Sequence, residues 1–149
     1  KKVILPDTVK VIEQNAFVRC SLNYIRMPRR LKELGSYAFY SSALKKITVY
    51  GKVELGETFK YCKKLKTVVL KEGVKELGEL VFHQCPKLRS VTVPKSVKSL
   101  VCIYDNIFYY RGLKCNLSKL TIKTPKNSEM YRYRKFWKKQ YKIKVKVIK

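Results

Sequence analysis

Apolar and polar residues alternate along the chain in a pattern that recurs five times. Each copy has the form Leu-x-x-Ile-x-Val, with Leu, Ile, Val or Met exchanged between the last two apolar positions. The alternation at the end of a copy, as in Ile47-x-Val49, is typical of a short strand that buries one face. The repetition therefore predicts a chain of similar short units. The leading leucines are Leu22, Leu44, Leu65, Leu88 and Leu117, which are 22, 21, 23 and 29 residues apart.

A second apolar cluster accompanies each copy and ends in a phenylalanine. One unit of this size cannot close a hydrophobic core, whereas stacked units share one. Both clusters are therefore predicted to fill the interior of a solenoid. Gly35, Gly56 and Gly78 occupy one position of the repeat, where a tight turn or a close approach between coils favours glycine. The phenylalanines are Phe17, Phe39, Phe59, Phe82 and Phe108.

The carboxyl end departs from the repeat. Asn127 or Ser128 can cap the N-terminus of a helix, with Glu129 in its first turn. An apolar stripe at helical spacing follows, and a strand with alternating lysines comes after it. Because the end of a solenoid exposes core and strand edges, this segment is predicted to cover the last coil. A helix that binds a membrane surface or nucleic acid is the alternative. The stripe is Met130, Tyr133, Trp137 and Tyr141, and the strand alternates Ile143, Val145 and Val147 with lysines.

The repeat unit resembles the BspA-like leucine-rich repeat family, whose unit is L-x-x-I-x-I-P-x-x-V-x-x-I-G-x-x-A-F-x-x-C. The stretches IRMPRRLKELGSYAF, VKELGELVFHQC and LRSVTVPKSV carry the likeness, over about residues 3–100 and more loosely 117–123. Tyr50 and Gly51 stand where the family has proline. The resemblance implies an α/β repeat solenoid of right-handed coils of about 22 residues, with a parallel sheet on one face and a capping helix and strand.

This reading predicts one leucine-rich repeat domain over residues 1–149, with about five coils in 1–123 and a cap in 124–149. The chain is expected to be part of a longer protein, because it opens within a repeat. No stretch approaches 18 apolar residues, so no transmembrane segment is expected. By resemblance, the protein is bacterial and is placed at the cell surface or secreted, as an adhesin-like module; a cytoplasmic protein is the alternative.

The charge is strongly basic and uneven. Lys and Arg number 35 against 10 Asp and Glu, a formal charge of +25. Residues 106–149 contain 14 basic side chains and one acid, Glu129. Such a field favours attraction to nucleic acid, acidic glycans or anionic membranes.

Catalytic constellations are scarce. A Ser-His-Asp or Cys-His arrangement would need the one histidine, His83, which follows a core phenylalanine and is interpreted as a turn residue. No enzyme, cofactor, metal site or small-molecule substrate is therefore predicted. Cysteine recurs three residues after phenylalanine and is expected to be a core thiol, at Cys20, Cys62 and Cys85. Cys102 and Cys115 could pair with each other, and Asn116-Leu117-Ser118 is a glycosylation sequon.

The outward residues of the strands form two predicted columns without an acid. Stacked coils would place them in one continuous strip that suits a protein or glycan ligand, or is simply a solvated sheet. A third column, Lys10, Lys32, Lys75 and Lys98, is either a soluble face or an anion-binding ridge. The strip begins with Lys2 and Ile4 and continues through Tyr24, Arg26, Lys46, Thr48, Thr67, Val69, Ser90, Thr92, Lys119 and Thr121.

Two functions are therefore predicted. The first is a non-catalytic scaffold that binds a protein partner through this strip, from Tyr24 to Thr121. The alternative is electrostatic binding of a polyanion by the basic carboxyl third. The residues predicted for that role are Arg132, Arg134, Lys135, Lys138, Lys139 and Lys142. The partner, the organism and the oligomeric state are left open.

Overall fold

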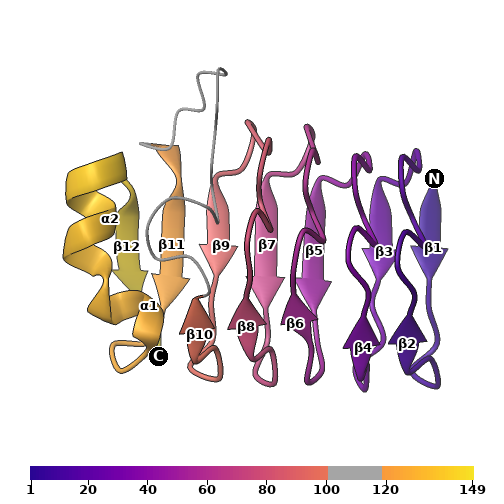
Figure 1. Ribbon diagram of the computed structural model, residues 1–149, viewed down its shortest axis with the longest axis horizontal. Helices are drawn as coiled ribbons and strands as arrows, with labels where there is room; N and C mark the ends of the chain where they lie inside the picture. Colours follow the sequence, from indigo (N-terminus) through magenta and orange to yellow (C-terminus); the bar gives the residue numbers. More distant parts are fainter. Residues whose placement is uncertain (101–118) are drawn as a thin grey trace.

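The structure, a computed structural model, describes residues 1–100 and 119–149. The chain winds through about six turns, and the turns are stacked along the long axis (Figure 1). One long strand of each turn lies on what we call the sheet side, and a two-residue strand of each of the first five turns lies on the short-strand side. The turns are counted in chain order, so that the first turn contains β1, the second contains β3 and the third contains β5. The predicted repeat solenoid with a parallel sheet is confirmed.

All strand pairs are parallel. The sheet side consists of β1 (Lys2–Ile4), β3 (Tyr24–Arg26), β5 (Lys46–Val49), β7 (Thr67–Leu70), β9 (Ser90–Thr92), β11 (Thr121–Thr124) and β12 (Lys144–Val147). The short-strand side consists of β2 (Val11–Ile12), β4 (Glu33–Leu34), β6 (Glu54–Leu55), β8 (Glu76–Leu77) and β10 (Ser99–Leu100). Two helices, α1 (Glu129–Arg132) and α2 (Arg134–Tyr141), lie between β11 and β12 in the sequence.

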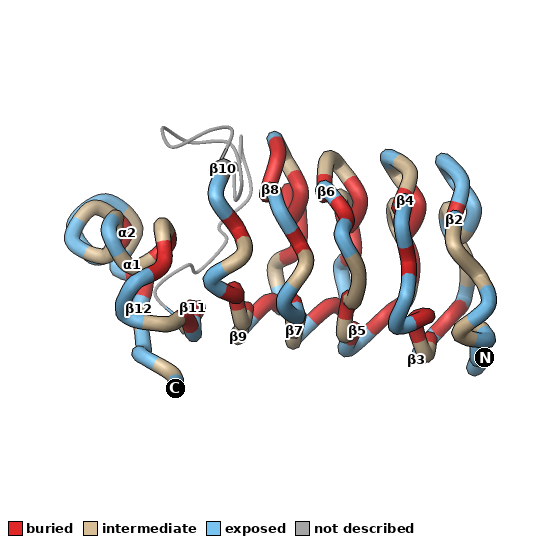
Figure 2. The backbone as a smooth tube through the Cα atoms, turned by 90° about the horizontal axis from the view of Figure 1, so that it is seen from below, coloured by how far each residue is buried: buried red, intermediate tan, exposed pale blue. Residues whose placement is uncertain are grey.

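The interior is filled by the two predicted apolar clusters. Buried positions recur in every turn (Figure 2), and they include Ile25, Ile47, Val68 and Val91 of the strands. The phenylalanines form a stack through four turns, in which successive ring centroids from Phe17 to Phe82 lie 5.3, 5.7 and 6.0 Å apart and the planes are within 9° of parallel. The repeat is thus a device for building one shared core.

A third side, which we call the turn side, comprises residues 13–20, 35–42, 56–62 and 78–85. Its turns are joined by backbone hydrogen bonds, for example from Phe39 N to Thr58 O at 3.0 Å. The thiols of Cys62 and Cys85 donate to carbonyl oxygens of the preceding turn at 3.0 and 3.1 Å. Burial raises the pKa of Cys62 to about 11, so this thiol stays protonated.

The three described cysteines are free thiols, which confirms the prediction of core thiols for Cys62 and Cys85, while Cys20 is partly exposed. The predictions for Cys102, Cys115, the sequon at 116–118 and Phe108 concern residues outside the described part of the chain.

The sheet side is interrupted between the second and third turns. Between the described residues of β3 and β5 there is no hydrogen-bonded register, and β4 and β6 are likewise in separate sheets. The predicted strip therefore has no strand pairing at this point, although β3 and β5 remain in contact. The connection from β5 to β6 is shorter than the others, and it places Gly51, with a φ of +94°, against the carbonyl of Leu31. A Cβ atom at Gly51 would lie 2.0 Å from that oxygen, so the close approach requires glycine here.

The register of the last repeat also differs from the prediction. Ile122 pairs with Val91, where the pattern placed Leu120. Lys119 therefore precedes β11 and leaves the predicted column, and Thr121 lies beside Ser90 instead of Thr92. The shift is two residues, so inward and outward positions are retained. It is stabilised at the strand's end, where the buried Thr124 hydroxyl lies 2.6 Å from Ser128 Oγ.

The cap has the predicted elements in a different arrangement. Ser128 is the N-cap, and its side chain accepts a hydrogen bond from the Tyr131 amide at 3.1 Å. The expected single helix is divided at Tyr133 into α1 and α2. Met130 and Trp137 are buried against the core, and β12 pairs with β11 as a closing strand.

Thr58 offers a test of core polarity. Its side chain is fully buried, and its hydroxyl has no hydrogen-bond partner among the described residues. The T58V substitution removes an unsatisfied polar group at nearly constant volume, so we expect it to raise the free energy of unfolding by about 1 kcal/mol. Urea denaturation followed by circular dichroism measures the change. A T58V protein less stable than the wild type would contradict the inferred environment.

Candidate functional site

The sheet side presents two columns of outward side chains. One runs Lys46, Thr67 and Ser90, and the other runs Thr48, Val69 and Thr92, in the registers of β5, β7 and β9. In the separate sheet of the first two turns, Tyr24 lies beside Lys2 and Arg26 beside Ile4. The predicted residues from Tyr24 to Thr92 thus face one side in two blocks.

The amino-terminal block carries exposed apolar surface. Ile4 and Tyr24 are 56% and 46% exposed, and Lys2 Nζ lies 5.4 Å from the centre of the Tyr24 ring. Arg26 is paired with the carboxylate of Asp7 at 3.2 Å. The Arg29 amide also donates to that carboxylate, and together with the cationic side chains it holds the pKa of Asp7 below its usual value. An aromatic, an aliphatic and a paired cation therefore meet at the surface.

The columns become basic toward the cap. Lys123 lies beside both Thr92 and Lys146, and Lys144 lies beside Thr121. Sequence reasoning missed Lys123 because it used the wrong register for β11. It identified the alternation of Lys144 and Lys146 with valines, but it did not place this strand in the sheet beside the predicted columns.

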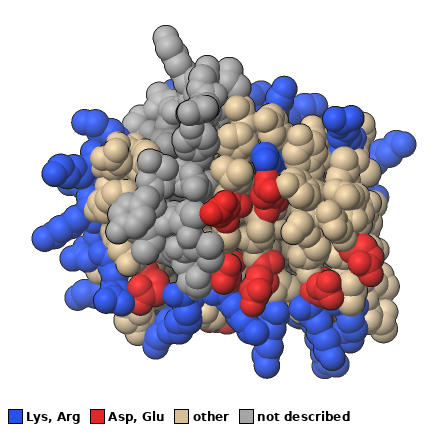
Figure 3. Space-filling model, in the orientation of Figure 1, with Lys and Arg blue, Asp and Glu red and all other residues tan. Residues whose placement is uncertain are grey.

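The short-strand side has mixed charge. Glu54 of β6 lies directly beside Glu76 of β8, and lysines flank the acids. Acidic side chains gather on this side, with Lys and Arg along its lower edge (Figure 3). Lys32 and Lys75, two members of the predicted lysine column, line a groove of about 720 Å³ together with four glutamates. The acids offset the lysines, which favours a solvated face over an anion-binding ridge.

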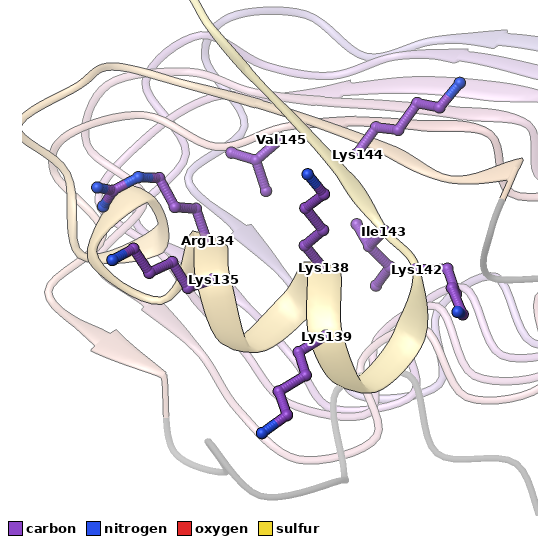
Figure 4. Close-up of a pocket in the computed structure, with 8 residues that line it drawn as sticks. All are labelled: Arg134, Lys135, Lys138, Lys139, Lys142, Ile143, Lys144 and Val145. Carbon is purple, nitrogen blue, oxygen red and sulfur yellow. The ribbon is translucent and has the colours of Figure 1, made fainter.

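The cap contains a basic pocket, defined as the cavity of about 890 Å³ between α2 and β12 (Figure 4). Six of its lining residues are cations, and none of the eight described residues that line it is acidic. Val145 supplies apolar surface to the pocket, and Ile143, which also lines it, is fully buried. Five of the six residues predicted for polyanion binding are brought together here. The cations are Arg134, Lys135, Lys138, Lys139, Lys142 and Lys144.

The sixth predicted residue, Arg132, is not among these lining residues. Its guanidinium is paired with Glu129 at 2.7 Å, one helical turn away. Arg134 donates to the Tyr131 carbonyl at 3.2 Å, and its guanidinium carbon lies 4.3 Å from the centre of the Tyr131 ring. The pocket therefore concentrates positive charge on α2 and the first residues after it. Repulsion between such cations at exposed sites favours a bound anion.

His83 lies in a turn, as predicted, with its ring edge-on to Tyr61 at 5.4 Å. The Glu57 carboxylate, in the turn before that of His83, accepts hydrogen bonds from Lys60 of its own turn and from Tyr37 of the preceding turn. Burial opposes ionisation of Glu57, but these two donors hold its pKa below the usual value.

Across the described residues, no cluster of three or more His, Cys, Asp or Glu is placed to hold a metal ion. No helix in the described part of the chain is long and apolar enough to cross a membrane.

Comparison with solved structures finds two leucine-rich repeat proteins. A leucine rich cell surface protein from Faecalibacterium prausnitzii A2-165 is 15% identical, with a TM-score of 0.48, over 100% of this chain and 60% of that chain. A leucine-rich repeat protein from Bacteroides ovatus ATCC 8483 is 19% identical, with a TM-score of 0.37, over 100% of this chain and 54% of that chain. The chain thus spans between about half and three fifths of these two proteins. A search of curated proteins finds no match.

The family evidence comes from the sequence itself. The model of a family described as "BspA type Leucine rich repeat region (6 copies)" matches residues 1–114 and, in an overlapping second match, residues 57–141. The two matches together include all the strands of the first five turns and both cap helices. The chain belongs to the BspA-type leucine-rich repeat family.

Proposed function

We propose that this protein is a non-catalytic repeat scaffold that binds a protein partner through its sheet side. The observation that carries the proposal is the straight columns of outward side chains on β5, β7 and β9, which include no acid. Repeat solenoids use extended surfaces of this kind for binding. The exposed Tyr24 and Ile4 add aromatic and aliphatic surface of the type found in protein interfaces. A cell-surface or secreted location remains a prediction from family resemblance.

Photo-crosslinking tests the sheet side directly. A photoreactive phenylalanine analogue replaces Thr67 in one variant and Glu54, on the short-strand side, in a matched variant. Both variants are incubated with the proteins of the medium and of the cell surface. We expect crosslinks to a specific protein from position 67 and few from position 54, with loss of the crosslinked band in a Y24A/T92K background. Equal crosslinking at the two positions would contradict the proposal.

A second function is favoured by the basic pocket, namely electrostatic binding of a polyanion. Five predicted cations and Lys144 line one cavity that has no acid among its described lining residues. Neutralising phosphates or sulfates releases counterions, so affinity for such a ligand falls steeply with salt. The ligands that fit this function have in common a row of negatively charged groups.

Heparin chromatography and a matched pair of triple variants test this function. K135Q/K138Q/K139Q neutralises the pocket, and K32Q/K52Q/K75Q removes the same net charge from the short-strand side. We expect the pocket variant to elute at clearly lower salt than the wild type, and the control variant to shift much less, because its lysines are already offset by glutamates. Equal shifts would assign retention to net charge alone and would contradict a site in the cap.

A further inference from the structure

The outer edge of β12 bears on what the basic pocket binds. β12 is the last strand in its sheet within the described part of the chain. The amides of Lys144 and Ile148 donate to β11, to Leu120 O and Thr124 O, both at 3.1 Å. Successive residues of a strand direct their backbone groups to opposite edges, so the N–H and C=O groups of Val145 and Val147 face away from β11. These groups form a template for another strand.

The basic pocket lies along this template. Val145 belongs both to β12 and to the lining of the pocket, and Ile143, which precedes the strand, is fully buried beneath it. The Ile143 amide already donates to Trp137 O at 3.2 Å, at the end of α2, so pairing can begin at Val145. Lys138 extends from α2 toward the strand near Val145, whereas Lys139 points away from it (Figure 4). The edge and the cations therefore share one space.

The spacing of the cations suits an extended chain. Arg134 and Lys138 are one helical turn apart on α2, which corresponds to about 6 Å along the axis, and Lys142 follows as the C-cap of the helix. Alternate side chains of a strand are about 6.6 Å apart. A strand added beside β12 can thus direct a carboxylate at every second residue toward this row. Six cations and no acid among the described lining residues provide the charge complementarity.

We propose that the edge of β12 binds an extended, acidic polypeptide segment as an additional strand, with its carboxylates against the cations of α2. The proposal rests on the polyanion-binding function of the pocket and identifies its ligand. The backbone groups decide for a polypeptide, because the free edge offers both donors and acceptors. A peptide main chain complements both. Phosphate and sulfate groups supply acceptors only, and the donors of a glycan or nucleic acid do not have the regular spacing of strand amides.

The length of β12 limits the occupant. The strand has four residues, Lys144–Val147, and two of them face the free edge. A segment of about four to six residues is sufficient, with Asp or Glu alternating with small or β-branched residues. The apolar surface of Val145 favours the β-branched positions over a uniformly charged polymer.

Fluorescence anisotropy with designed peptides tests the proposal on the unmodified protein. The probe is a fluorescein-labelled eight-residue peptide that alternates glutamate and valine. Two further peptides carry N-methyl groups on every second residue, on the glutamates in one and on the valines in the other. Only one edge of an added strand bonds to β12, and each edge uses alternate residues. We therefore expect one methylated peptide to lose at least tenfold in affinity and the other to bind like the parent.

Two protein variants and two competing polyanions complete the experiment. V145P removes a free-edge N–H without removing a bond to β11, and it should lower peptide affinity at least tenfold. K135Q/K138Q should lower peptide affinity by a similar factor, because it removes two positive charges. Both residues belong to α2, so the backbone of β12 is unchanged in this variant. Heparin and single-stranded DNA are measured beside the peptide.

The outcomes separate this inference from the function on which it rests. Equal binding of the parent and both methylated peptides would overturn strand addition and leave polyanion binding intact. DNA or heparin that binds more than tenfold tighter than the peptide would also overturn the polypeptide assignment. Absence of binding to all three ligands would overturn both.

Discussion

Truncation of Phe59 to alanine is expected to lower the free energy of unfolding by about 3–5 kcal/mol. The ring is fully buried and lies between Phe39 and Phe82, with centroid separations of 5.7 and 6.0 Å. Its removal leaves a cavity between the rings of Phe39 and Phe82. The backbones of the stacked turns are held by hydrogen bonds, so they cannot move together to fill this cavity. Urea or guanidinium denaturation measures the loss.

Phe17 provides the matched comparison. It is the first ring of the stack, contacts only Phe39 among the described rings, and is partly exposed. The F17A substitution should therefore cost clearly less than F59A. A loss for F17A as large as that for F59A would mean that the stack contributes little beyond the burial of single rings.

The second large effect is expected for G35A. A Cβ atom at this position would lie 2.3 Å from Gln14 N and 2.7 Å from Gln14 Cα, both backbone atoms of the preceding turn. Because a backbone in a hydrogen-bonded coil cannot move aside alone, we expect destabilisation by about 2–3 kcal/mol or more. Thermal unfolding of the purified variant gives the measurement.

Gly56 occupies the same position of the next repeat and serves as the control. A Cβ atom there would meet only Ser36 Oγ, at 3.5 Å, which is ordinary contact. G56A should leave stability nearly unchanged or raise it slightly, since alanine restricts the unfolded chain. If both variants lost the same stability, steric clash would be excluded as the cause.

Much of the fold could be predicted from sequence because each repeat places apolar residues at the same positions to fill the shared core. Ile47, Val68 and Val91 lie at one spacing from their leading leucines, and the structure buries all three in one register. The register of β11 could not be predicted, because leucine, isoleucine and threonine leave two placements that differ by two residues. The hydrogen bond between Thr124 and Ser128 joins side chains of the last strand and the cap, and apolar spacing does not report such a bond.

The candidate sites were predictable to different degrees. Helical spacing alone places Arg134 and Lys138 on one face of α2, whereas Lys142 is the C-cap in a left-handed conformation. It does not report that Arg132 is paired with Glu129, nor that Lys144 joins the pocket from another element. The composition shows that this segment is basic. Which of its cations line one pocket depends on where β12 returns after α2.

The interruption between β3 and β5 has a consequence for cooperativity. In repeat proteins, stability is approximately the sum of terms for each unit and for each contact between neighbouring units. At this contact, among the described residues, the strand ladders are missing, and the ring contact of Phe39 with Phe59 and the turn-side hydrogen bonds remain. We therefore expect the first two turns to open as a block more readily than the later turns. A ligand that spans β3 and β5 would connect the two blocks and make the solenoid unfold as one unit.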